Sequence, residues 1–168
     1  SPPPSPPPPD EAVPPYTEGV CRTLSSMVPN TFYSSVGERW ENNDGLSLTI
    51  NGVLYDEVVS MHPVSSATYD ALGPWAFHEF YACASIRDLP ANGGGDGVHA
   101  YVYLNQATTH IVELKVYRNE APKCFSVPMT GVTSMKLVTT PGAEGNSEWD
   151  WRAPRPIADP VFAPKHIR

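Results

Sequence analysis

Six side chains have the chemistry that sugar recognition requires, and four of them fall within one short, loop-rich stretch. Binding a sugar needs an aromatic ring for the apolar face of the sugar ring and planar polar groups for its hydroxyls. These side chains are His62, Tyr69, Trp75, His78, Trp149 and Trp151. A structural interpretation stands beside this one, in which Tyr69 and Trp75 close one end of a packed domain and Trp151 lies buried under its last strand.

Catalytic chemistry has weaker support in the sequence. Cys83 and His62 could form a nucleophile and base, but Cys83 falls within a predicted strand, where no basic group or helix terminus would lower its pKa. Acidic pairs occur in polar, turn-like stretches, at Asp56-Glu57 and at Glu144 with Glu148. Such stretches are solvated by default, so we expect no enzymatic activity. A glycosidase fragment remains an alternative that needs two facing carboxylates in a cleft.

Four aspartates could contribute to a calcium site, because hard cations prefer carboxylate and carbonyl oxygens. They are Asp44, Asp88, Asp96 and Asp150. No Asp-x-Asp-x-Asp-Gly loop occurs, and Asp96-Gly97 is more simply a turn. We therefore expect no cofactor and keep structural calcium as the open alternative.

The chain has three cysteines, Cys21, Cys83 and Cys124, whose spacing fits no zinc motif. In an extracellular setting the simplest arrangement is one disulfide and one remaining thiol, which could pair with another subunit. Three reduced, buried cysteines are the alternative. The sequence leaves open which two would pair.

The domain that would position these side chains is predicted to be all-β. Short apolar or alternating runs, separated by Gly, Pro and Asn turns, indicate strands at 46–50, 53–55, 80–86, 98–104, 111–117, 125–127 and 135–138. A single helical turn is the most that the periodicity allows, near 65–72. Many short strands at this spacing are typical of a β-sandwich or jelly roll.

Three regions follow from the composition. Nine of the first fifteen residues are proline, so residues 1–15 are predicted to form a polyproline II arm, about 28 Å long over its first nine residues. Residues 16–152 form the domain, and residues 153–168, with four prolines, form an extended tail or strap. The net charge of −7 argues against nucleic-acid and anionic-membrane partners, and no apolar run approaches the ~20 residues of a membrane span.

The arm resembles the repeat of extensin-type hydroxyproline-rich glycoproteins of plant and green-algal cell walls. Two repeats carry the resemblance, Ser-Pro3 and Ser-Pro4. It implies proline hydroxylation followed by O-glycosylation, over Ser1, Pro2, Pro3, Pro4, Ser5, Pro6, Pro7, Pro8 and Pro9. A plain proline-rich linker is the alternative.

The core resembles the NPCBM family of carbohydrate-binding modules, which have a galactose-binding-like β-sandwich. The matching segments occur in order at 48–55, 61–70, 80–88, 97–105, 127–137 and 150–151. Three departures stand out: Ser85 replaces a glycine, Asn105 stands where an aspartate begins the hairpin, and the final motif is shortened to Trp149-Asp150-Trp151. The resemblance implies an all-β jelly-roll fold more strongly than an inherited sugar site.

Two functions compete as a result, and the sequence favours the first. The first is a structural subunit of an extracellular fibre or of a cell-surface or cell-wall layer, in which the glycosylated arm of one copy docks on a neighbour's sandwich. Trp75, Tyr69 and Trp149 would then stack on proline rings or arabinose. The second is a carbohydrate-binding module, free-standing or appended to an enzyme, that recognises galactose-type glycans. The partners expected are glycans and other copies of the chain.

Overall fold

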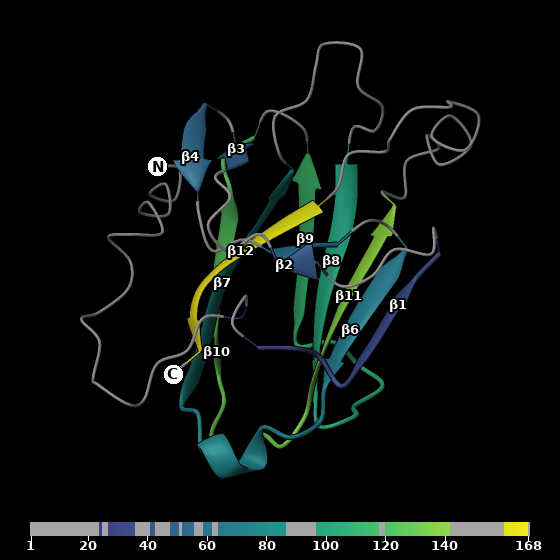
Figure 1. Ribbon diagram of the computed structural model, residues 1–168, viewed down its shortest axis with the longest axis vertical. Coiled ribbons are helices and arrows are strands. Elements are labelled where there is room, and N and C mark those ends of the chain that lie inside the picture. Colours follow the sequence, from purple (N-terminus) through teal and green to yellow (C-terminus); the bar gives the residue numbers. More distant parts are fainter. Residues whose placement is uncertain are drawn as a thin grey trace.

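The computed structural model describes residues 24, 27–35, 41–42, 48–50, 52–55, 59–61, 64–86, 97–117, 120–141 and 160–167. Within them most residues lie in strands, and helix is limited to short 3-10 turns. The predicted all-β sandwich is confirmed, with two antiparallel five-stranded sheets facing each other (Figure 1). Among the described residues no helix is both long and apolar enough to cross a membrane.

The first sheet has the strand order β1-β6-β11-β8-β9. Its strands are β1 (Thr31–Ser34), β6 (Ser65–Tyr69), β11 (Met135–Pro141), β8 (Gly97–Leu104) and β9 (Val112–Tyr117). Successive side chains of a strand point to opposite faces of its sheet. On β8, Val98, Ala100 and Val102 are buried in the core, so His99 and Tyr101 face the outside of the sandwich.

The second sheet has the strand order β10-β7-β12-β5-β2. Its strands are β10 (Lys123–Pro128), β7 (Glu79–Ile86), β12 (Pro160–Ile167), β5 (Val59–Ser60) and β2 (Glu41–Asn42). A separate hairpin of β3 (Leu48–Ile50) and β4 (Val53–Tyr55) confirms the predicted tight turn, where Gly52 has a φ of 80° that favours glycine.

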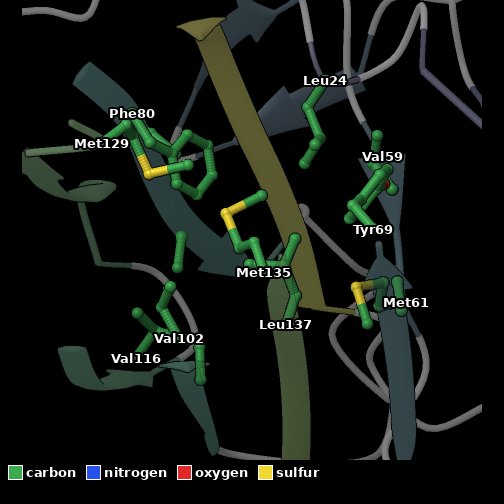
Figure 2. Close-up of a cluster of buried hydrophobic side chains, with 14 of the residues drawn as sticks. Leu24, Val59, Met61, Tyr69, Phe80, Val102, Val116, Met129, Met135 and Leu137 are labelled. Carbon is green, nitrogen blue, oxygen red and sulfur yellow. The ribbon is translucent and has the colours of Figure 1, made fainter. Parts of the chain in front are cut away.

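The core fills the space between the two sheets. Figure 2 shows Phe80 of the second sheet near Met129, with Met135 and Leu137 of the first sheet beside them. Each of these four side chains is almost fully buried. Burying one such side chain stabilises the fold by roughly 1.5–3 kcal/mol relative to exposing it, so this apolar layer holds the sheets together.

Strand β7 is buried on both of its faces. Phe80, Ala82, Ala84 and Ile86 face the core, while Tyr81, Cys83 and Ser85 on the other face are buried as well. Burial, and secondarily the charge of Glu79, raise the pKa of the Tyr81 hydroxyl above its ordinary value. This second buried face breaks the alternation of apolar and polar residues that the sequence shows elsewhere.

A disulfide joins Cys83 of β7 to Cys124 of β10. The two residues lie directly opposite each other in the antiparallel register, with 3.9 Å between their Cα atoms. The expectation of a disulfide is thereby confirmed, and the pairing that the sequence left open is resolved. Cys21 lies outside the described residues. The bond ties the edge strand β10 to the neighbouring strand β7.

Of the predicted extended tail of residues 153–168, the described part, Pro160–Ile167, forms the strand β12. This strand lies between β7 and β5 in the second sheet, and the register along β7 shifts between Pro164 and His166. Proline is tolerated in a sheet at the start of a strand or at a bulge. Pro160 is the first residue of β12 and Pro164 adjoins the irregularity, so both occupy tolerated positions.

The stretch predicted to contain a helical turn is a strand followed by a short 3-10 turn. Residues Ser65–Tyr69 form β6, with Ser65, Ala67 and Tyr69 facing inward, and Gly73–Trp75 form η2. The inward residues follow the two-residue period of a strand. The helical element therefore starts later than the sequence indicated, at the proline-containing turn.

Candidate functional site

The aromatic side chains predicted to bind a ligand lie in different environments. Tyr69 is 2% exposed and belongs to the core, whereas Trp75 is 46% exposed on η2 and His78 is exposed just before β7. Trp75 stacks on Phe77, with 6.0 Å between the ring centroids. His62, Trp149 and Trp151 lie outside the described residues, so the predicted set is only partly placed.

The expectation that Tyr69 contacts a ligand is corrected by its position. It occupies an inward site of β6, where the side chain packs against the core rather than facing solvent (Figure 2). This fits the structural interpretation, in which Tyr69 closes one end of the domain. Trp75 and His78 do share an exposed loop, so they remain candidates at that end of the sandwich.

A groove with a volume of about 560 Å³ lies on the outer face of the first sheet. Its floor comes from outward side chains of β6, β11 and β8, and one wall comes from the loop that follows β8. It is lined by Thr68, Tyr103, Gln106, Ala107, Thr108, Ser134, Met135, Lys136 and Val138. The lining combines one aromatic ring with hydroxyl, amide and ammonium groups, which suits a polar ligand that has an apolar face.

Strand register sets the floor of the groove. Lys136 lies directly opposite Thr68 on one side and Tyr103 on the other, and Val138 lies opposite Ser66 and Tyr101. Directly opposite side chains have Cβ atoms about 4.5–5.5 Å apart. The Tyr103 ring and the Lys136 side chain are therefore neighbours on one surface, although 33 residues separate them in the sequence.

Asn105 holds the wall of the groove in place. Its side-chain Oδ1 accepts hydrogen bonds from the Thr133 amide at 2.8 Å and from the Ser134 amide at 3.4 Å. Its φ of 51° and the φ of 59° at Gln106 turn the chain sharply after β8. Asparagine tolerates this left-handed region better than most residues, so Asn105 both makes the turn and anchors it.

Aromatic rings extend from the groove along the outer face. The Tyr103 ring meets His110 edge to face, and Tyr101 contacts the same imidazole at a centroid distance of 5.2 Å. His110 Nε2 lies 3.4 Å from a Glu113 carboxylate oxygen, and His99 Nδ1 lies 3.3 Å from the Tyr101 hydroxyl. These contacts fix the orientation of the rings, which reduces the entropy that a bound ligand would cost.

The sequence carries a signal for this surface outside the loop-rich stretch of aromatic residues. His99, Tyr101 and Tyr103 occupy alternate positions of a predicted strand, and alternate positions share one face. Their exposure to the outside depends on which face packs inward. The small residue Ala100 and the β-branched Val98 and Val102, between the rings, mark that inward face.

The described residues bring together no group of three or more His, Cys, Asp or Glu side chains suited to a metal ion. Cys83 is in a disulfide, so it is not available as the nucleophile of a Cys83–His62 pair. The candidate calcium ligands and acidic pairs lie outside the described residues, at Asp44, Asp56, Glu57, Asp88, Asp96, Glu144, Glu148 and Asp150.

Comparison with protein families gives one match. The profile described as the NPCBM/NEW2 domain covers residues 22–155. That range includes the strands that build the groove and all six segments on which the resemblance rested. Among curated proteins, none matches the chain.

Solved structures with the same fold include several CBM51 domains. CBM51 from Clostridium perfringens GH95, in complex with methyl-galactose, is 19% identical with a TM-score of 0.68, covering 88% of this chain and 99% of that one. CBM51-2 with the INT domains of Clostridium perfringens ZmpB, in complex with GlcNAc, is 17% identical with a TM-score of 0.66, covering 88% and 31%. The tandem CBM51 modules of Sp3GH98, a family 98 glycoside hydrolase from Streptococcus pneumoniae SP3-BS71, are 12% identical with a TM-score of 0.64, covering 89% and 47%.

These likenesses establish a shared fold. The chain spans nearly all of the first of these structures but only about a third and about half of the other two, which contain further domains.

Proposed function

The chain belongs to the NPCBM/NEW2 domain family, and on that premise we propose that it is a carbohydrate-binding module whose glycan lies in the groove on the outer face of the first sheet. Two of the similar structures hold a sugar, methyl-galactose in one and GlcNAc in the other. This chain shares their fold. The sugars bound in those structures support a carbohydrate as the ligand of this chain, but they do not identify which sugar it is.

The observation that carries the proposal is the lining of the groove. The Tyr103 ring offers an apolar surface on which one face of a sugar ring can stack. Gln106, Thr108 and Thr68 supply side-chain amide and hydroxyl groups that can donate to sugar hydroxyls or accept from them. The volume of about 560 Å³ falls within the range of small-ligand sites.

The rigidity of the surroundings favours binding without large rearrangement. The groove floor is a hydrogen-bonded sheet, and its wall is anchored through Asn105. A site held in place before the ligand arrives loses little conformational entropy on binding. We expect a weak to moderate affinity, as suits a shallow site on a sheet, and no catalysis.

Tyr103→Ala tests this proposal against the site near Trp75. We expect Tyr103→Ala to weaken glycan binding about tenfold, because it removes both the apolar ring area that a sugar would cover and a stacked contact of ~0.5–1.5 kcal/mol. The matched variant Trp75→Ala removes an exposed ring from the other candidate site and should leave binding unchanged. Isothermal titration calorimetry against neutral galactose and glucose oligosaccharides gives the affinities, and circular dichroism checks folding.

The reverse result would place the glycan site elsewhere on the domain. If Trp75→Ala abolishes binding and Tyr103→Ala does not, the ligand occupies the loop of Trp75 and His78, and the groove is not the glycan site. Tyr103→Phe serves as a further control. It keeps the ring, so it should bind nearly as well as the native protein if stacking carries the interaction.

A second candidate function rests on the Ser-Pro arm. A structural subunit of an extracellular fibre or wall layer is favoured by the two repeats at residues 1–9, which lie outside the described residues. A preformed polyproline II segment loses little entropy when it docks on an aromatic groove. The disulfide supports an oxidising, extracellular location for either function.

A further inference from the structure

Among the described residues that line the groove, Lys136 alone carries a charge at neutral pH. It lies on β11, between Thr68 of β6 and Tyr103 of β8, and its side chain is exposed. The cation therefore stands beside the ring on which a sugar would stack. The reach of a lysine side chain is enough to place its ammonium at the edge of that sugar.

Within the described residues, no neighbouring group neutralises Lys136. No carboxylate within the described part of the chain lies at ion-pair distance from its ammonium, whereas Lys123 has Glu120 at 3.4 Å. Glu113, on the same outer face, is paired with His110 at 3.4 Å. The ammonium of Lys136 is thus available for an anion from outside.

This positive charge contrasts with the rest of the molecule. The whole chain has a net charge of −7, which would repel an anionic ligand from most of its surface. A cation at the centre of an uncharged groove gives such a ligand one favourable position. A hydrogen bond from an ammonium to a carboxylate or sulfate oxygen is also stronger than one to a neutral hydroxyl.

From this charge complementarity we infer that the groove selects an anionic sugar, one that carries a carboxylate or a sulfate ester toward Lys136. The inference rests on the proposed function and adds the chemical class of the ligand. In the bound arrangement the sugar ring stacks on Tyr103, the acidic group accepts from Lys136, and the neutral hydroxyls contact Gln106 and Thr108.

The test uses ligands that differ only at the C6 position. Methyl galactoside, methyl galacturonide and methyl galactoside 6-sulfate present a hydroxymethyl, a carboxylate and a sulfate there, and a parallel series is built on glucose. We expect the native protein to bind an acidic member about tenfold or more tightly than the neutral one, since a hydrogen bond to a charged group has about this effect on Kd. The carboxylate and sulfate arms identify which anion is preferred.

Lys136→Gln should bring the affinities for the acidic and neutral ligands to within about twofold of each other, and Lys136→Arg should retain the preference. Lys115→Gln is the matched control, because Lys115 lies on the same face, opposite His99, but outside the groove lining. Raising the NaCl concentration from about 0.05 M to about 0.5 M should weaken binding of the acidic ligand alone, since salt screens exposed charges.

The outcomes separate the two proposals. Equal binding of neutral and acidic sugars by the native protein, unaffected by Lys136→Gln, overturns the charge inference and leaves the groove as a neutral-sugar site. An acidic preference that Lys115→Gln removes and Lys136→Gln does not also overturns it. Failure of every ligand in both series to bind the native protein overturns the proposed function, and the charge inference with it.

Discussion

Asn105 shows how one side chain can hold the wall of a groove in place without lining the groove. Its Oδ1 accepts from the amides of Thr133 and Ser134, and the Thr133 hydroxyl lies within 3.3 Å of the same oxygen. These bonds connect the end of β8 to the segment before β11, which are the two parts that flank the groove wall. In the NPCBM pattern an aspartate stands here, and its carboxylate could accept the same bonds.

Replacing Asn105 separates its two roles. We expect Asn105→Ala to destabilise the fold by about 1–3 kcal/mol, because it loses several hydrogen bonds and puts alanine at a φ of 51°. Asn105→Gly keeps the backbone freedom and loses only the bonds, so it should destabilise less than Asn105→Ala. Asn105→Asp keeps the acceptor and should remain close to native. Urea unfolding monitored by fluorescence gives the three values.

Equal stability of the alanine, glycine and native proteins would contradict this account of the turn. Glycan affinity provides a second measurement on the same variants. Because the wall carries Gln106 and Thr108, loosening it should weaken binding even where the fold survives.

At the scale of elements, alternation made several strands predictable. The runs at 98–104 and 135–138 correspond to β8 and β11, and the hairpin at 46–55 corresponds to β3 and β4. The inward positions of 98–104 and 135–138 are apolar in the period of two that a half-buried sheet requires. Strand β7 was also predicted, although its burial on both faces is not visible in its sequence.

The groove could not be predicted in the same way. It depends on the register that places Thr68, Lys136 and Tyr103 side by side, and those residues belong to three strands that are distant in sequence. Choosing site residues by aromatic type therefore selected Tyr69, which faces the core. The disulfide was similarly left open, because only the pairing of β7 with β10 sets Cys83 opposite Cys124.

The disulfide should contribute substantially to the stability of the second sheet. It closes a sequence separation of 41 residues, for which restriction of the unfolded chain predicts about 4 kcal/mol. We expect a Cys83→Ser, Cys124→Ser double variant to unfold at lower urea concentration by a corresponding amount. Cys21→Ser is the control and should leave stability near the native value, since Cys21 is not part of this bond.

Thiol counting completes that experiment. The protein without substitutions, denatured in the absence of reductant, should show one free thiol. After reduction it should show three. A stable double variant with an unchanged midpoint would mean that hydrogen bonding and packing along β7 and β10 suffice to hold the edge strand without the covalent link.

At the scale of the whole molecule, the groove and the C-terminal strand belong to different sheets of the sandwich. The groove lies on the outer face of the first sheet. The C-terminal strand β12 lies between β7 and β5 in the second sheet (Figure 1). The N-terminal arm of residues 1–15 lies outside the described residues, so its chemistry must be tested directly on the protein. The proposed glycan site uses residues of the first sheet and its adjoining loops, whereas the alternative, a fibre subunit, depends on the arm.

Mass spectrometry of the native protein distinguishes a wall-glycoprotein arm from a linker. If the resemblance to extensin repeats holds, peptides covering Pro2–Pro9 will carry hydroxyproline with attached pentose, and Ser1 or Ser5 will carry hexose. Peptides from β8 and β9 serve as the internal control and should be unmodified. Unmodified prolines would remove the main support for a fibre subunit, because the docking of a glycosylated arm is the step on which that assembly depends. The carbohydrate-binding module would then account for the folded domain by itself, since its groove is built entirely from the first sheet and its adjoining loops.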